Sequence, residues 1–260
     1  SAFVYISVGA GENWDNFVNW SLRKDYGGIE NLSLIPGNVG SAPIQNIGAY
    51  GVELDSVFES CRAISLENKK VKIFHKIDCD FTYRSSVFKE KLKNKYIISR
   101  VVFKLTKKSH FLKTNYKPLK ELIKIKNIPN PTIQDISNLV KEIRSSKLPD
   151  PKIIGNCGSF FKNPVISKNK LEKISSIDKL IPFYKLSDEK FKIPAAWLIE
   201  KCGMKGRIEG QTGTHKEHAL VIINLGAATG TEIYNFSQKI KKLVLKKFNI
   251  LLEEEVNIID

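Results

Sequence analysis

Three short stretches of the sequence hold side chains that could do chemistry. One of them, residues 148–164, reads LPDPKIIGNCGSFFKNP and is too rich in turn-forming residues for a helix interior. Gly155 and Gly158 can take a positive φ, and Ser159 follows them directly, with two phenylalanines behind it. This pattern indicates a serine side chain that is directed at a ligand. An ordinary surface turn anchored by two phenylalanines would have the same sequence pattern.

A second stretch, FTYRSSVF at residues 81–88, places Arg84 among aromatic side chains. Arginine is always charged, and its burial without an anion is costly. Because Phe81, Tyr83 and Phe88 surround it in the sequence, the pattern favours a bound carboxylate or phosphate. A surface arginine at the end of a hairpin remains the alternative.

The third stretch is a run of three carboxylates, Glu253, Glu254 and Glu255, inside NILLEEEVNII. We predict a final strand over residues 248–259, in which Glu253 and Glu255 share one face and Glu254 lies on the other. At least one carboxylate then faces inward. Such a group is either paired with a lysine or catalytic.

A glycine-rich loop is expected over residues 34–51, LIPGNVGSAPIQNIGAYG. Its glycines and small polar residues would offer many backbone N–H donors, of the kind that surround a diphosphate or the edge of a ring. It lacks the GK[ST] of a P-loop and the spacing of a dinucleotide-binding fingerprint. The members are Gly37, Gly40, Ser41, Gln45, Asn46, Gly48 and Gly51.

Composition bounds the class of protein. With 260 residues, 42% of them hydrophobic and 27% charged, the chain can form one large domain or two modest ones. Four well-separated cysteines without metal-ligand spacing predict free thiols, no metal site and a reducing cytoplasm. The net charge of +15 is spread along the chain without a nucleic-acid motif, so an anionic small molecule is the better partner.

Periodicity predicts a strand from the first residue and a helix through Trp14 and Leu22 that stops at Gly27. Strands follow over 57–66, 71–74 and 96–105, as an antiparallel meander. A second domain is expected to begin near Ser109.

The second half of the chain is predicted to alternate helices and strands. Thr132 should cap one helix and Thr231 another, with further helices over 169–176 and from Pro194 to Gly203, and a strand over 219–224. Helices and strands in this order form an α+β layer.

The motifs, taken in order, resemble the UDP-N-acetylenolpyruvoylglucosamine reductase (MurB) family. They are GAGENW, IPGNVGSAPIQNIGAYGVEL, YRSSVFK, KLPDPKIIGNCGSFFKNP, AAWLIEKCGMKG and LLEEEV, and they cover essentially the whole chain. Tyr184, in a loop before AAWLI, resembles the type with a substrate-capping loop.

The resemblance implies an α+β fold with part of an FAD-binding domain of the PCMH/VAO-like type and a C-terminal α+β substrate-binding domain. The expected boundaries are 1–108, 109–237 and 238–260, the last closing the active site. Family members begin with a further segment carrying a GGGSN-like motif, which this sequence lacks. We therefore expect Phe3, Val4 and Ile6 to be exposed or badly paired, the flavin half to be partly disordered, and these 260 residues to bind FAD poorly.

The resemblance also implies the reaction. NADPH would reduce bound FAD, and the flavin would reduce UDP-N-acetylglucosamine enolpyruvate in peptidoglycan precursor synthesis. Ser159 would be the proton donor, Arg84 would pair with the substrate carboxylate and Glu255 would help to polarise it.

Further contacts follow by motif match. Gly37, Gly40, Ser41, Ile44, Gly48, Tyr83 and Arg84 would line the cofactor, and Tyr116, Lys147, Asn163, Tyr184, Lys205 and His218 would contact the substrate. Some family members carry glutamine in place of His218, and an ordinary surface or core histidine is the alternative there. A cytoplasmic monomer without nucleic-acid or membrane partners is expected.

Two other functions fit part of the pattern. Another FAD oxidoreductase of the same flavin-binding superfamily would share the glycine-rich loop but would not need GSFFKNP or the C-terminal glutamate. A covalent flavin or rapid oxygen consumption would favour it. A binding module without catalysis is the second alternative, and salt-dependent DNA retention without flavin colour would favour that.

Overall fold

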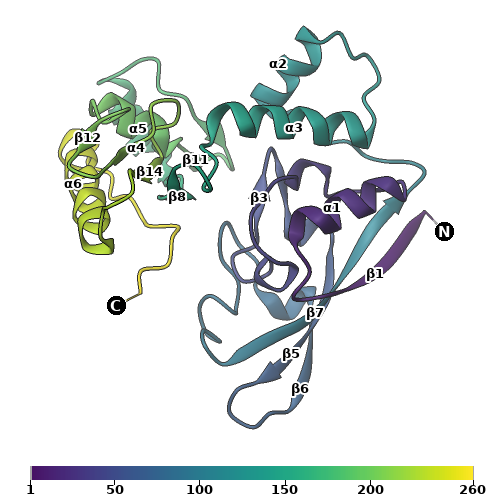
Figure 1. Ribbon diagram of the computed structural model, residues 1–260. Coiled ribbons are helices and arrows are strands. Elements are labelled where there is room, and N and C mark those ends of the chain that lie inside the picture. Colours follow the sequence, from purple (N-terminus) through teal and green to yellow (C-terminus); the bar gives the residue numbers. More distant parts are fainter. Residues whose placement is uncertain (1, 260) are drawn as a thin grey trace. The chain divides into compact units, whose positions relative to one another are not determined.

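The computed structural model describes residues 2–259 (Figure 1). Its contacts divide the chain into two compact units, Ser1–Arg144 and Ser145–Asp260. The domain boundary expected near Ser109 thus differs from the observed boundary, which follows Arg144. The segment after Ser109 forms α2 (Lys117–Ile125) and α3 (Ile133–Lys147), which bury Leu119, Ile136, Leu139, Val140 and Ile143 in a cluster of the first unit that also contacts Tyr50.

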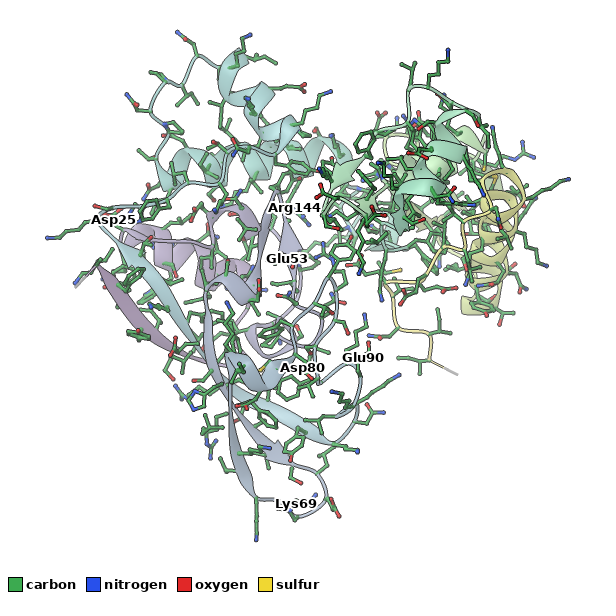
Figure 2. The ribbon with its side chains drawn as sticks, turned by 180° about the vertical axis from the view of Figure 1, so that it is seen from behind. Asp25, Glu53, Lys69, Asp80, Glu90 and Arg144 are labelled. Carbon is green, nitrogen blue, oxygen red and sulfur yellow. The ribbon has the colours of Figure 1, made fainter. Side chains whose placement is uncertain are left out.

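The first unit is built on an antiparallel sheet in the order β1-β7-β5-β6, with β2 also paired to β7. The strands are β1 (Phe3–Gly9), β2 (Tyr26–Gly27), β5 (Phe58–Ser65), β6 (Val71–His75) and β7 (Tyr96–Lys107). Short 3-10 turns cover Glu30–Leu32, Val39–Ser41, Leu54–Ser56 and Lys76–Cys79. The predicted antiparallel strands are confirmed. Lys69 lies in the turn at the outer end of the β5–β6 hairpin (Figure 2).

Strand β1 is the edge strand of this sheet and pairs along its whole length with β7, contrary to the expectation of a badly paired first strand. All seven of its residues have partners on β7, from Phe3 opposite Thr106 to Gly9 opposite Arg100. The twelve-residue length of β7 lets it carry this ladder and the β5 ladder on its other side. Phe3 is 41% exposed, as expected, whereas Val4 and Ile6 pack partly against the core.

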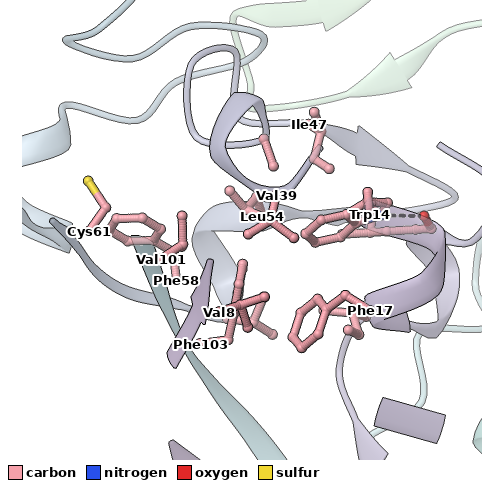
Figure 3. Close-up of a cluster of buried hydrophobic side chains, with 14 of the residues drawn as sticks. Val8, Trp14, Phe17, Val39, Ile47, Leu54, Phe58, Cys61, Val101 and Phe103 are labelled. Atoms are coloured by element: carbon pink, nitrogen blue, oxygen red, sulfur yellow. Dashed lines mark hydrogen bonds between the residues drawn. The ribbon is translucent and has the colours of Figure 1, made fainter. Parts of the chain in front are cut away.

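Helix α1 (Trp14–Arg23) closes the core of this unit. Asn13 caps it by accepting the N–H of Asn16, and the rings of Trp14 and Phe17 meet Phe103 of β7 at centroid distances of 5.8 and 4.9 Å (Figure 3). Full burial of such a side chain contributes about 1.5–3 kcal/mol. The helix ends before the predicted Gly27.

Residues 148–259 of the second unit hold two small antiparallel sheets and three helices. One sheet has the order β12-β13-β14-β8 and the other β10-β11-β9. The bounds are β8 (Gly155–Ser159), β9 (Val165–Ser167), α4 (Lys168–Ser175), β10 (Tyr184–Lys185), β11 (Lys190–Lys192), α5 (Ala195–Lys201), β12 (Ile208–Glu209), β13 (Thr212–Thr214), β14 (Val221–Asn224) and α6 (Gly230–Phe248). Phe161, Leu198 and Ile240 lie at the centre of its core.

Two predicted details of this unit are wrong. Thr229 caps α6 in place of Thr231, because Thr229 and Glu232 form a capping box in which each side chain accepts the other's backbone N–H. Residues 249–259 do not form the predicted strand. Among the described residues, this segment forms one isolated antiparallel β-bridge with the rest of the unit, between Glu254 and Phe161.

Candidate active site

The glycine-rich loop of the first unit lies on the turn between β1 and α1. Gly40 donates its N–H to the carbonyl of Ala10 at 2.9 Å, and the N–H of Trp14 reaches the carbonyl of Gly37 at 3.0 Å. A Cβ at Gly40 would lie 2.5 Å from the Cβ of Ala10. Only glycine permits this approach, so Gly40 fixes the loop to the end of the first strand.

This loop also offers backbone donors. Gly37 has a φ of +112°, and the N–H groups of Gly37 and Asn38 have no hydrogen-bond acceptor among residues 2–259. Adjacent unused donors suit an anionic oxygen, so the loop fits the diphosphate of a nucleotide such as FAD. The hydroxyl of Ser41 instead donates to Asn38, and Ile44 accepts from Ser86 within the core.

Arg84 is largely buried, with 16% of its side chain exposed. It adopts a left-handed backbone conformation, with φ +56°, in a tight turn closed by the bridge between Thr82 and Ser85. Its Nη2 donates to the carbonyl of Gly48 at 2.6 Å, and its guanidinium carbon lies 5.0 Å from the ring centre of Tyr83. These contacts exclude the alternative of a solvated surface arginine.

Gly48 belongs to a hairpin that sequence reasoning missed. Its strands are β3 (Gly48–Ala49) and β4 (Val52–Glu53), and both tip residues, Tyr50 and Gly51, have positive φ, which is the pattern of a type I′ turn. Tyrosine is unusual at such a position, so the usual Asn-Gly signal is absent.

Contacts to the ring and hydroxyl hold Tyr50 in this conformation. Its ring meets that of Tyr116 edge to face at 5.4 Å, and its hydroxyl lies beside the guanidinium of Arg144. Burial raises the pKa of Tyr50 and lowers that of Arg144. Figure 2 labels Arg144 and also Glu53, the last residue of β4 in the same hairpin. Tyr116, a predicted substrate contact, is therefore packed against the hairpin that carries Gly48.

Ser159 of the second unit lies at the end of strand β8 and not in a loop. It is paired with Val221, and the N–H of the next residue, Phe160, reaches the carbonyl of Leu220 at 2.9 Å. Gly158 has the predicted positive φ, +72°. The two phenylalanines that follow are buried, as the sequence predicted, so the chain directly after the serine is anchored in the core.

The three C-terminal glutamates have different surroundings. Glu253 forms an ion pair with Lys162, whereas Glu254 accepts hydrogen bonds from Lys241 at 2.8 Å and Gln238 at 2.9 Å. Burial raises the pKa of Glu254, but these hydrogen bonds outweigh it and the net pKa is lowered. Glu253 and Glu254 are thus both paired with lysines, and Glu254 is the more buried of the two.

Glu255 lies beside the serine strand. Its backbone N–H donates to the carbonyl of Phe160 at 2.8 Å, and its side chain is half-buried. Because Phe160 directly follows Ser159, the structure brings these two predicted residues onto adjacent segments of one unit.

Three predicted substrate residues also come together in the second unit. His218 has a pKa lowered to about 4, first by burial and then by the charges of Lys147, His215 and Lys205. The other two predicted substrate residues of this unit lie elsewhere: Asn163 accepts the N–H of Ala195, the first residue of α5, at 2.8 Å, and Tyr184 is 38% exposed in β10.

We expect His218 to make stability depend on pH. Its pKa is about 6.5 in the unfolded chain and about 4 in the folded one, so its contribution is complete above pH 6.5 and is lost as the pH falls toward 4. The loss at pH 4.5 should be on the order of 2 kcal/mol. Urea unfolding at pH 7 and pH 4.5 measures it, and His218→Gln should lose that much less than the wild type. Equal losses in both proteins would contradict the prediction.

Comparisons with known proteins give a family match in each of the two units. Residues 3–71 match the family model of an FAD binding domain, and residues 150–259 match that of the UDP-N-acetylenolpyruvoylglucosamine reductase C-terminal domain. No helix among residues 2–259 is both long and apolar enough to cross a membrane.

Relatives match over nearly the whole chain. UDP-N-acetylenolpyruvoylglucosamine reductases of Flavobacterium johnsoniae and Amoebophilus asiaticus are 48% and 46% identical over 99% and 98% of this chain, and 76% and 75% of their own lengths. The fold matches the crystal structure of the Thermus caldophilus enzyme with a TM-score of 0.66 at 22% identity, covering 97% of this chain and 71% of that one.

The α+β fold and the FAD-binding match define the chain as a flavin-dependent oxidoreductase with a separate C-terminal domain. The identity to the curated relatives is specific enough to go further. The chain belongs to the UDP-N-acetylenolpyruvoylglucosamine reductase family.

Proposed function

We propose that the chain catalyses the NADPH-dependent reduction of UDP-N-acetylglucosamine enolpyruvate to UDP-N-acetylmuramate, a step in peptidoglycan precursor synthesis. The single observation that carries the proposal is the 48% identity over 99% of the chain to a reductase of this specificity. The placement of Ser159 and Glu255 on adjacent segments supports it. Bound FAD would supply the hydride carrier between NADPH and the methylene carbon of the substrate.

We assign the proton transfer to Ser159. Once the methylene carbon has accepted hydride, negative charge accumulates on the carbon beside the substrate carboxylate and on the carboxylate itself. Serine is a weak acid in water, so it can donate only to a strongly basic, desolvated carbon next to it. The paired strand and the buried phenylalanines behind Ser159 provide the fixed position that such a transfer requires.

Arg84 and Glu255 are assigned to the substrate carboxylate. The planar guanidinium of Arg84 can bind a carboxylate through two parallel hydrogen bonds and stabilise the charge that develops there. Glu255 would polarise the same group. The hydrogen bond from Nη2 of Arg84 to the carbonyl of Gly48 supports a fixed direction for its side chain.

The remaining assignments concern binding. The charges of Lys147 and Lys205, which both act on the uncharged His218, suit a diphosphate. We propose that His218, Tyr116, Asn163 and Tyr184 complete the substrate contacts. For FAD we propose Gly37, Gly40, Ser41, Ile44, Gly48, Tyr83 and Arg84. The free thiols of all four cysteines suit a reducing cytoplasm, and the expected monomer without nucleic-acid or membrane partners stays a prediction.

The proposed function has a direct spectroscopic test. Flavin absorbance of the protein loaded with FAD should fall when NADPH is added without oxygen, and should return when UDP-N-acetylglucosamine enolpyruvate follows. Each half-reaction is recorded separately, and the product is identified by its mass. A flavin that NADPH reduces but that oxygen alone reoxidises, with no effect of the sugar nucleotide, would favour an oxidase and exclude the proposed reaction.

A further inference from the structure

Asn46 forms a buried polar junction beside Arg84. It is 1% exposed and has a φ of +45°, a conformation that asparagine tolerates better than most residues. Its amide nitrogen donates to Glu53 at 3.2 Å and to the carbonyl of Thr82 at 3.1 Å, and its amide oxygen accepts the N–H of Asp55 at 3.0 Å. A buried amide with these three partners has one fixed orientation.

Glu53 connects this junction to Arg84. Its Oε2 accepts from Asn46, and its Oε1 lies 3.9 Å from Nη1 of Arg84. On the other side, Arg84 crosses Gly48 so closely that a Cβ there would lie 2.8 Å from Nη1 and 2.9 Å from Cγ of Glu53. The side chain of Arg84 therefore lies between the carboxylate of Glu53 and the backbone of β3. Asn46 also donates a hydrogen bond to the carbonyl of Thr82, which belongs to the same turn as Arg84.

We propose that Glu53 and Asn46 are positioning residues that hold Arg84 in place before the substrate arrives. The proposal rests on the role assigned to Arg84 under the proposed function. An arginine loses many rotamers when it binds a carboxylate, and fixing it beforehand removes that cost from the reaction. A negative partner also makes burial of the guanidinium tolerable in the absence of substrate.

The first test needs neither flavin nor substrate. The chain has six arginines, so its arginine Nε–Hε groups give a small NMR spectrum in which Arg84→Lys identifies the Arg84 signal. That signal should exchange slowly with solvent in the wild type and be broadened or lost in Glu53→Gln and Glu53→Ala. Glu90→Gln is the matched control, since Glu90 accepts from the hydroxyl of Ser85 next to Arg84 and should leave the signal unchanged. An unchanged Arg84 signal in both Glu53 variants would overturn the proposal.

The second test uses the flavin-loaded protein and separates the two half-reactions. Oxidation of reduced flavin by saturating substrate should slow about tenfold in Glu53→Gln, which still accepts from Asn46, and about a hundredfold in Glu53→Ala. Reduction by NADPH should stay within about twofold of the wild type, as should both steps in Glu90→Gln. Equal slowing of both half-reactions would assign Glu53 to cofactor binding and overturn the proposal. If the wild type fails to use the substrate, the proposed function fails, and the NMR experiment still decides whether Glu53 holds Arg84.

Discussion

Replacement of Ser159 by alanine is expected to slow the oxidation of reduced flavin by substrate about a hundredfold or more, the scale of a missing general acid. Reduction of the flavin by NADPH should remain nearly intact, because no proton is needed from this residue in that step. The strand should persist, since Ser159 contributes its backbone to the pairing with Val221. Rapid-mixing absorbance measurements of the two half-reactions give both rates.

The control for this variant lies in the same strand. Cys157 is exposed two residues away, so Cys157→Ala removes another small polar side chain from β8 and should leave both half-reactions unchanged. If Ser159→Ala slows both half-reactions equally, the serine holds the cofactor and does not donate the proton.

Arg84→Lys should cost about 2–4 kcal/mol of transition-state stabilisation, seen in the rate at saturating substrate more than in KM. Lysine keeps the charge but loses the planar pair of donors, and an ammonium cannot both reach the carbonyl of Gly48 and bind a carboxylate through two bonds. Single-turnover kinetics over a range of substrate concentrations separate the two effects.

Arg62→Lys provides the matched exchange. Arg62 donates to Ser99 on the surface of the sheet, and its replacement should leave turnover at the wild-type level. A wild-type rate for Arg84→Lys would show that the charge alone suffices at residue 84, and that the assignment of a bidentate contact is wrong.

Periodic segments of the sequence predicted the fold well. Burial of one face of a helix or strand leaves a periodic pattern of apolar residues within that segment alone. Such a pattern is seen in α1, α3, β5, β6 and β7. The predicted burial behind Ser159 was also correct, because two adjacent phenylalanines leave few other solutions.

Features that depend on distant partners were not predictable in this way. Ser159 lies in a strand despite its glycine neighbours, because β14 supplies a pairing edge more than 60 residues later in the chain. Thr231 and Thr229 are equally good caps by type, and only the spacing to Glu232 selects Thr229. Tyr50 adopts a turn conformation that its residue type disfavours, because Arg144 and Tyr116 hold its side chain.

The run of three identical glutamates poses a problem of alignment. Nothing within the run distinguishes one member from the next, so a shift of the C-terminal segment by one residue would exchange their positions without changing the local chemistry. Two lysines from other parts of the unit fix the alignment, since Lys162 pairs with Glu253 and Lys241 pairs with Glu254. The burial of Leu252, directly before the run, fixes it further. The identity of the glutamate beside Phe160 is therefore encoded outside the run, in residues that need take no part in catalysis.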